Sequence, residues 1–219
     1  MSTFKYLYLS LLLLILSDGA FAGEKDTVFR PSVRIGVDFS GVPRNLLEPE
    51  TRTWEVSLDY EWSKNWFVAI EAGGVNIEVD QPTHDYHSGG NFFRIGADYN
   101  ILGRKGPDHL DLVLLSARYG YGSLDHYASR VIISSPYWGD YETAFPEENL
   151  SAHWLELGGG VKTQIWRNFF LGWSLRGRLL VSKTSHPAMD PYFISGFGRY
   201  RDGNFSVMMH YSLFYRIGF

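Results

Sequence analysis

The stretch FSVMMHYSLFYRIGF, residues 205–219, places an apolar or aromatic side chain at every second position. These side chains are Phe205, Val207, Met209, Tyr211, Leu213, Tyr215, Ile217 and Phe219. Most residues between them are small or polar, among them Ser206, His210 and Arg216. Because successive side chains of a strand point to opposite faces, the pattern predicts one face in lipid and one toward a polar interior. We expect this strand to close a barrel.

Similar alternation recurs upstream, giving about eight segments in all. The other segments are 33–39, 54–62, 66–73, 93–100, 111–122, 154–165 and 169–179. Together they predict an all-β fold, an eight-stranded antiparallel transmembrane β-barrel with up-and-down meander order. The register of the fifth segment is the least clear, because Leu112 and Leu114 fall on its inward face.

The links between the segments alternate in length. Short turns are expected at 63–65, 101–108 and 166–168, and longer loops at 41–51, 78–90, 123–150 and 182–203. Outer-membrane barrels have short periplasmic turns and long external loops. The pattern therefore predicts that all the long links lie outside the cell.

The N-terminal region predicts export. Lys5 precedes an apolar stretch from Leu7 to Leu16, and Ala20-Phe21-Ala22 supplies a small-x-small cleavage pattern. We expect a signal peptide at residues 1–22 and a barrel at residues 23–219. The chain has 0 Cys, so disulfides cannot stabilise it, and its net charge of -4 gives no basic patch for a nucleic acid.

Charged residues fall on the predicted inward face of nearly every segment. An eight-stranded barrel is just wide enough for side chains to fill, and buried charges must be paired. The sequence therefore predicts a lumen ion-pair network made of Asp38, Glu55, Asp59, Glu71, Arg94, Asp98, Arg118, Glu156, Lys162, Arg176, Arg178 and Arg216. A gated proton or ion path through the same groups is the alternative.

The link after the fifth strand is rich in aromatic residues. Tyr127, Tyr137, Trp138 and Tyr141 are candidates for binding, because exposed aromatics at this density favour contact with a protein, a glycan or lipopolysaccharide. A loop that folds over the barrel mouth is the other interpretation.

Two groups of residues resemble chemical sites. His84, Asp85 and His87 could ligate a metal, but histidines in a polar loop are usually solvated surface residues. His210 and Ser212 could be drawn with Glu156 as a triad, and this spacing resembles that of a lipid A deacylase. Both side chains are expected in the lumen, away from a substrate, so no catalytic residue, metal or cofactor is predicted.

Several stretches resemble a family of small outer-membrane barrels catalogued as a domain of unknown function. They are RIGVDFS (34–40), RIGADYN (94–100), AHWLE (152–156), FFLGWSLR (169–176) and PYFISGFGR (191–199). The last strand also resembles the C-terminal assembly signal of such barrels, carried here by Tyr211, Leu213, Tyr215, Ile217 and Phe219.

These resemblances imply a bacterial outer-membrane location in a Gram-negative envelope. Expected partners are outer-membrane lipid and lipopolysaccharide, the barrel assembly machinery during insertion, and an envelope protein complex. The expected role is that of a structural or interaction module, or an accessory subunit, acting through external loops. A lipid-modifying or proteolytic barrel enzyme is the alternative.

Overall fold

The computed structural model describes residues 31–42, 50–103, 110–184, 193–200 and 203–218. The predicted signal peptide at residues 1–22 lies outside these ranges. Within them, no helix has the length and apolar character needed to cross a membrane.

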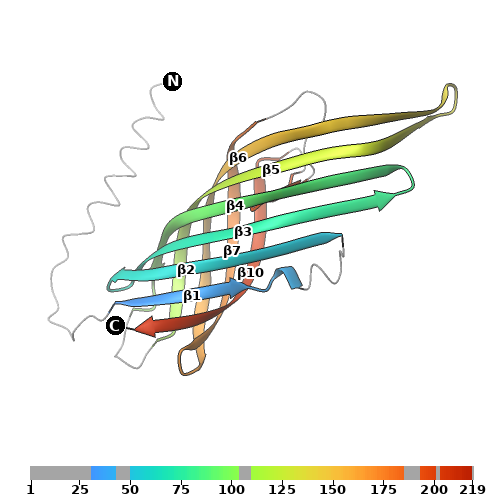
Figure 1. The fold of residues 1–219 in the computed structure, drawn as a ribbon. Coiled ribbons are helices and arrows are strands. Elements are labelled where there is room, and N and C mark those ends of the chain that lie inside the picture. Colours follow the sequence, from blue (N-terminus) through green and yellow to red (C-terminus); the bar gives the residue numbers. More distant parts are fainter. Residues whose placement is uncertain (1–30, 43–49, 104–109, 185–192, 201–202, 219) are drawn as a thin grey trace, which may run out of the picture.

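The described part of the chain is built from antiparallel strands. Eight of them are β1 (Ser32–Asp38), β2 (Thr51–Ser63), β3 (Trp66–Gln81), β4 (His84–Asn100), β5 (Leu112–Ser135), β6 (Gly139–Trp166), β7 (Phe169–Lys183) and β10 (Phe205–Gly218). They close into a barrel in which each strand pairs with its neighbours along the chain and β10 pairs with β1 (Figure 1). The predicted eight-stranded meander is confirmed.

Side-chain burial alternates along the barrel strands as the sequence predicts. On β5, Leu112 and Leu114 are buried while Val113 and Leu115 face outward. The sequence left the register of this segment least clear, and the structure places Leu112 and Leu114 on the inward face as expected. Inward residues form the lumen, and outward residues such as Leu157 and Leu213 form an apolar outer wall.

Two of the predicted long loops are wrong, because they are strands. The link at 78–90 is largely the continuation of β3 and β4, and the link at 123–150 is the continuation of β5 and β6 around a turn at 136–138. These four strands extend past the rest of the barrel (Figure 1). We call their outer parts, residues 76–91 and 123–150, the extension.

Inward and outward side chains continue to alternate in the extension, but there the inward side chains are apolar and the outward ones are polar. Along β5 the outward face changes from Leu115 and Tyr119 to Ser123 and Asp125, while the inward face changes from Arg118 to residues such as Leu124. The β3 strand inverts similarly, with Val75 and Ile77 buried. A strand that leaves lipid for water needs its apolar side on the other face.

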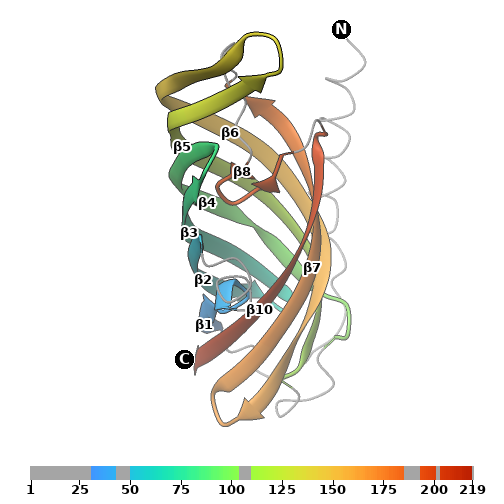
Figure 2. The same cartoon turned by 90° about the vertical axis from the view of Figure 1, so that its right-hand side faces the viewer.

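The inward apolar residues of the extension form a hydrophobic core at the mouth of the barrel. It includes the small hairpin of β8 (Phe193–Ile194) and β9 (Gly198–Arg199), which lies across the barrel end (Figure 2). We call this cluster the cap: Val75, Ile77, Phe92, Leu124, Leu150, Ala152, Trp154, Leu180, Phe193, Ile194 and Phe197. The described part of the predicted loop at 182–203 thus folds inward.

Glycines make room for the cap. Gly196, in the β8–β9 turn, has φ of 78°, and a Cβ there would meet the ring of Phe92. A Cβ on Gly120 of β5 would meet the indole of Trp154, which is 0% exposed. Neither position accepts a larger residue without displacing an aromatic ring of the cap.

Candidate functional site

The charged side chains predicted for the lumen meet below the cap in a connected series of ion pairs. Antiparallel closure brings the acidic residues of β2 to β4 across the lumen from the basic residues of β5 to β7. The connected residues are Glu55, Asp59, Glu71, Arg94, Asp98, Arg118, Glu156, Lys162, Arg176 and Arg178.

Glu71 lies at the centre of this series. Its carboxylate accepts two hydrogen bonds from Arg176, at 2.7 and 2.8 Å, in a bidentate arrangement. Arg94 Nε lies 2.9 Å from the same carboxylate, and Arg118 Nε lies 3.5 Å from it. One buried carboxylate is therefore shared by three guanidinium groups.

Glu156 forms a second centre nearer to the cap. It lies 2.9 Å from Arg178, 3.3 Å from Arg94 and 3.4 Å from Arg176. The indole of Trp154 also donates a hydrogen bond of 2.7 Å to it. This contact joins the ionic lumen to the hydrophobic cap.

A third group of ion pairs lies nearer to the end of the barrel where the short turns are. Lys162 Nζ lies 2.5 Å from Asp59 and 4.0 Å from Asp98. Arg118 lies 2.7 Å from Asp98, which links this group to Glu71. Burial of charge is costly unless it is paired, and every charge in this group has a partner of opposite sign.

The short-turn end of the lumen mixes charge with aromatic rings. Arg34 is fully buried with its guanidinium over the rings of Phe67 and Phe170, at 5.1 and 5.3 Å. Glu61 accepts a hydrogen bond of 3.0 Å from Ser32. Arg216, predicted for the network, lies on the inward face here, where it pairs in register with Arg34. Arg34 and Glu61, which alternation also places on the inward face, are both fully buried.

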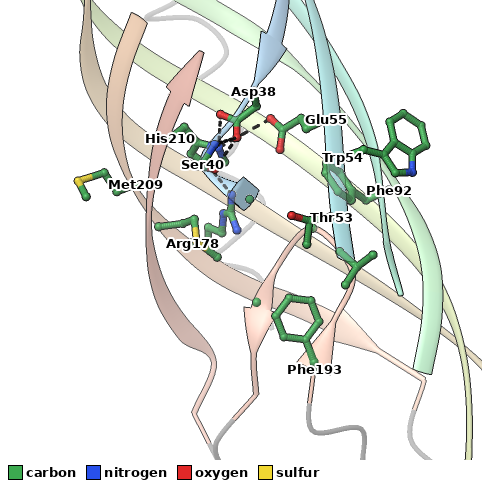
Figure 3. A pocket seen from close by; sticks show the side chains of 15 residues that line it. Asp38, Ser40, Thr53, Trp54, Glu55, Phe92, Arg178, Phe193, Met209 and His210 are labelled. Atoms are coloured by element: carbon green, nitrogen blue, oxygen red, sulfur yellow. Dashed lines mark hydrogen bonds and ion pairs between the residues drawn. The ribbon is translucent and has the colours of Figure 1, made fainter. Parts of the chain in front are cut away.

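A separate polar cluster lies at the mouth beside the cap. Asp38 of β1, Glu55 of β2 and His210 of β10 turn toward one another, with Arg178 on the other side of the imidazole (Figure 3). His210 Nδ1 lies 3.5 Å from Asp38 and 3.8 Å from Glu55, and its Nε2 lies 2.8 Å from Arg178. The cluster borders a cavity of about 110 Å³.

This cluster is the group within the described ranges whose ligand atoms, all within 4.8 Å of one another, could hold a metal ion. Arg178 opposes that role. A guanidinium only donates, so Nε2 of His210 must accept and a neutral imidazole carries its proton on Nδ1, the atom that faces the carboxylates. A metal would need the lone pair of that same atom. The donor set therefore does not fit a metal as it is arranged.

The arrangement also lacks the contacts of a hydrolase triad. Ser212 donates its hydroxyl hydrogen bond to Asp38 at 3.0 Å, and Nε2 of His210 is occupied by Arg178. Glu156 lies instead among arginines of the lumen. A serine nucleophile needs the imidazole as its proton acceptor, which this geometry does not supply.

The candidate binding aromatics lie on the extension. Tyr137 and Trp138 occupy the turn between β5 and β6 and are 92% and 91% exposed. Tyr141 is also exposed, whereas Tyr127 lies lower on the same hairpin and stacks on His87 with ring centroids 5.0 Å apart. The aromatic tip thus projects away from the mouth, and the interpretation of these residues as a cap is wrong; other residues form the cap.

The histidine-rich stretch of the sequence forms the end of the β3–β4 hairpin. Asp85 there is bound by Arg130 of β5 through hydrogen bonds of 2.9 and 3.1 Å. The hydrogen bonds from Arg130 hold the pKa of the Asp85 carboxyl below its usual value. Among the described residues, the side chains of His84, Asp85 and His87 do not come close enough together to form a metal-binding group.

The C-terminal assembly residues lie on the outer wall. Tyr211, Leu213, Tyr215 and Ile217 all face outward and are exposed. Tyr215 packs edge-on against Phe169 of β7, with ring centroids 5.2 Å apart. Phe219 lies outside the described residues.

Known structures share this architecture at low sequence identity. A major outer membrane protein from Thermus thermophilus is 11% identical, with 86% of this chain and 99% of that chain covered and a TM-score of 0.51. Ail, the attachment invasion locus protein of Yersinia pestis, is 14% identical over 86% and 98% of the two chains, with a TM-score of 0.44. Neisserial surface protein A is 11% identical over 90% and 100%, with a TM-score of 0.41.

Sequence comparison gives the family. No curated protein matches this chain. A family model described as "Domain of unknown function (DUF6048)" matches residues 2–219, which is nearly the whole length. The chain is a small eight-stranded barrel of the outer-membrane type, and it belongs to the DUF6048 family.

Proposed function

We propose that this protein is a surface interaction module of the bacterial outer membrane, with a lumen closed to diffusing solutes and an external hairpin that binds a cationic protein partner. The observation that carries the proposal is the near-complete exposure of Tyr137 and Trp138 at the tip of the longest hairpin. Large exposed aromatics mark interaction sites, because a partner that covers them removes apolar surface from water, and such residues dominate binding energy at interfaces.

The charge of the extension favours a cationic partner. Residues 76–91 and 123–150 contain eight carboxylates but one guanidinium, that of Arg130. This excess of negative charge repels the phosphates of lipopolysaccharide and attracts a basic protein surface. Arginine or lysine side chains of such a surface would also stack on the tip aromatics. Lipid contact is expected instead along the apolar outer wall.

The filled lumen supports a binding role over a transport role. Paired charges occupy the barrel centre, and an apolar cluster lies at each end: the cap, and the cluster of Phe67, Leu112 and Leu114. A diffusing solute would have to displace both ion pairs and packed side chains. We expect conductance in planar bilayers to stay at background for the wild type and for Trp138→Ser alike.

A photo-reactive residue at position 138 tests the proposal in intact cells. We expect a discrete protein adduct that weakens as the salt concentration rises, because screening reduces charge attraction. The same probe at position 123, an exposed position on β5 at the base of the same hairpin, is the matched control and should give no such adduct. Adducts with lipopolysaccharide alone, or equal adducts at both positions, would contradict a cationic protein partner.

The accessory-subunit role is a narrower form of the same proposal. It requires the partner to remain bound when native membranes are dissolved in mild detergent. The accessory-subunit role would be supported if the partner no longer copurified with the double variant Tyr137→Ser/Trp138→Ser. The variant barrel should still show heat-dependent gel migration, which indicates that it is folded. Turnover of lipid A, phospholipid or peptide that is abolished by His210→Ala would instead support the enzyme alternative.

A further inference from the structure

The outer part of β6 is paired with a neighbouring strand on one side only. Its pairing with β5 starts at Gly139, whereas its pairing with β7 starts only at Ala152. One more backbone bond, from Thr184 N to Ser151 O at 2.9 Å, extends the contact on the β7 side. Among the residues that the structure describes, no strand pairs with the other edge of β6 at 139–150.

The outermost part of this edge, 139–143, lies at the end of the hairpin that projects farthest from the barrel (Figure 1). Beyond Ile132, whose N donates to Thr83 O at 2.8 Å, β5 and β6 continue as a ribbon of two strands, 133–141. Two strands alone are marginally stable in water, whereas three strands with an apolar face are stable. A strand added beside β6 would therefore stabilise the ribbon.

The two faces of the ribbon differ in chemistry. Because successive side chains of a strand alternate, Asp140 and Glu142 share one face of β6, and both are exposed. Tyr141 and Thr143 lie on the other face, where Tyr141 is directly opposite Ile133. Tyr141 is 65% exposed and Ile133 is 52% exposed. A strand beside β6 would therefore place alternate side chains against an acidic face and an apolar one.

The charges of the edge favour a basic strand over a second copy of this chain. Free edges are commonly protected by lysines, prolines or bulges, but the stretch 139–143 has neither residue and pairs with β5 without irregularity. If this stretch paired antiparallel with itself about Tyr141, Asp140 would lie opposite Glu142, and like charges opposite each other are destabilising. Basic side chains at the same positions would form pairs of opposite charge.

We propose that the partner of the hairpin adds an extended segment of alternating basic and apolar residues as a new strand along β6 at 139–143. This inference rests on the proposed function, because it assigns the binding mode of the same cationic protein. In strand addition, main-chain hydrogen bonds give the affinity and alternate side chains give the specificity. The basic residues of the segment lie opposite Asp140 and Glu142, and its apolar residues extend the face formed by Tyr141 and Ile133.

Two synthetic peptides test the binding mode on the full chain folded in a non-ionic detergent. The probe is Lys-Val-Lys-Val-Lys-Val-Lys, and the matched control has the same side chains with every backbone nitrogen methylated. We expect the probe to bind at least about tenfold more tightly, because the control keeps the charge but cannot donate main-chain hydrogen bonds. Every second residue of an edge strand directs its N–H outward, so hydrogen exchange should slow at alternate amides of 139–143 when the probe is bound.

Removal of the acidic face should weaken binding of the probe without unfolding the barrel. Asp140→Asn/Glu142→Gln changes two exposed side chains and should lower the affinity about fivefold at low salt, because two cross-strand charge pairs are lost. Glu78→Gln/Asp80→Asn is the matched control, since it neutralises two exposed carboxylates of β3 and should change the affinity less than about twofold. Heat-dependent gel migration confirms the folded barrel in each case.

The outcomes separate strand addition from the proposed function. Equal binding of the probe and the methylated control, or unchanged exchange at 139–143, would overturn strand addition, while a protein adduct at position 138 would still support a cationic partner. Unchanged affinity in folded Asp140→Asn/Glu142→Gln would overturn the alternating basic segment. Slowed exchange at 139–143 that increases with protein concentration in the absence of peptide would assign the edge to a second copy instead. Failure of the probe to bind, together with no adduct at position 138, would overturn both proposals.

Discussion

The barrel centre and the extension are built from the same strands with opposite interiors. In the centre, residues such as Glu71 and Arg176 are buried and leucines face outward. In the extension, Leu124 and Ile77 are buried and residues such as Asp125 and Glu78 face outward. The medium outside the wall decides which side chains face inward, so the inversion near Gly122 locates the boundary between lipid and water.

The largest expected effect comes from breaking the ionic interior. Glu71→Gln leaves Arg94, Arg118 and Arg176 without their shared carboxylate, and removing one partner of a buried ion pair destabilises by about 5 kcal/mol at the upper end of the usual range. The urea midpoint in detergent should fall accordingly. Glu71→Met/Arg176→Met removes one charge of each sign and should be less destabilising than the single change. The reverse order would contradict the ion-pair account.

Breaking the apolar interior should have a large but local effect. Phe197 is fully buried against Trp154, with ring centroids 6.1 Å apart. Phe197→Ala should cost about 3 kcal/mol in the cap and release the β8–β9 hairpin. Limited proteolysis should then cut within 193–200 while the barrel remains intact. Cleavage throughout the barrel would show that the cap and the lumen unfold together.

A pair of arginine substitutions on one face of β5 tests where the boundary lies. Leu115→Arg places a charge on the lipid side and should destabilise by about 2–4 kcal/mol, whereas Ser123→Arg beyond the boundary should change stability by about 0–1 kcal/mol. Both positions are exposed and face outward. Unfolding in lipid vesicles measures the difference, and equal values would place both positions in the same medium.

The smallest effect is expected at the exposed ion pair of the extension. Because the pKa of Asp85 is lower in the folded than in the unfolded chain, its pairing with Arg130 stabilises above the unfolded pKa and is lost as pH falls through the folded pKa. Arg130→Gln should raise the pKa of Asp85 toward its usual value, as followed by NMR titration. In acid, the variant and the wild type should become equally stable. If the pKa of Asp85 is unchanged in Arg130→Gln, then Arg130 does not cause its lowering.

The sequence was sufficient for the strands and their facing, because alternation against lipid is a strong signal. It was insufficient for the extension. At Ser123 the outward side chains become polar, which is typical of the start of a loop, although the period of two continues through Leu124 and Ala128. The alternation of inward and outward side chains, which continues to about residue 130, indicates the longer strand more reliably than the polarity of its outward face.

The candidate site was less accessible to prediction. The inward direction of Asp38, Glu55 and His210 follows from alternation, but their meeting depends on the stagger of the strands around the closed barrel, which no single segment encodes. Shared facing therefore allows His210 to be grouped with Glu156, whereas in the structure it lies beside Asp38. The short β8 and β9 strands, of two residues each, are too brief to show a period.

The short β1 strand also determines how the molecule responds to force. The barrel closes where seven residues of β1 pair with β10, whereas β5 and β6 pair along most of their 24 and 28 residues. Pulling the first and last strands apart loads β1, whose ladders with β10 and with β2 are the two shortest of the closed barrel, with seven and six residue pairs. Mechanical opening would therefore begin with the release of β1 from one of its two neighbours, and the long β5–β6 hairpin would open late.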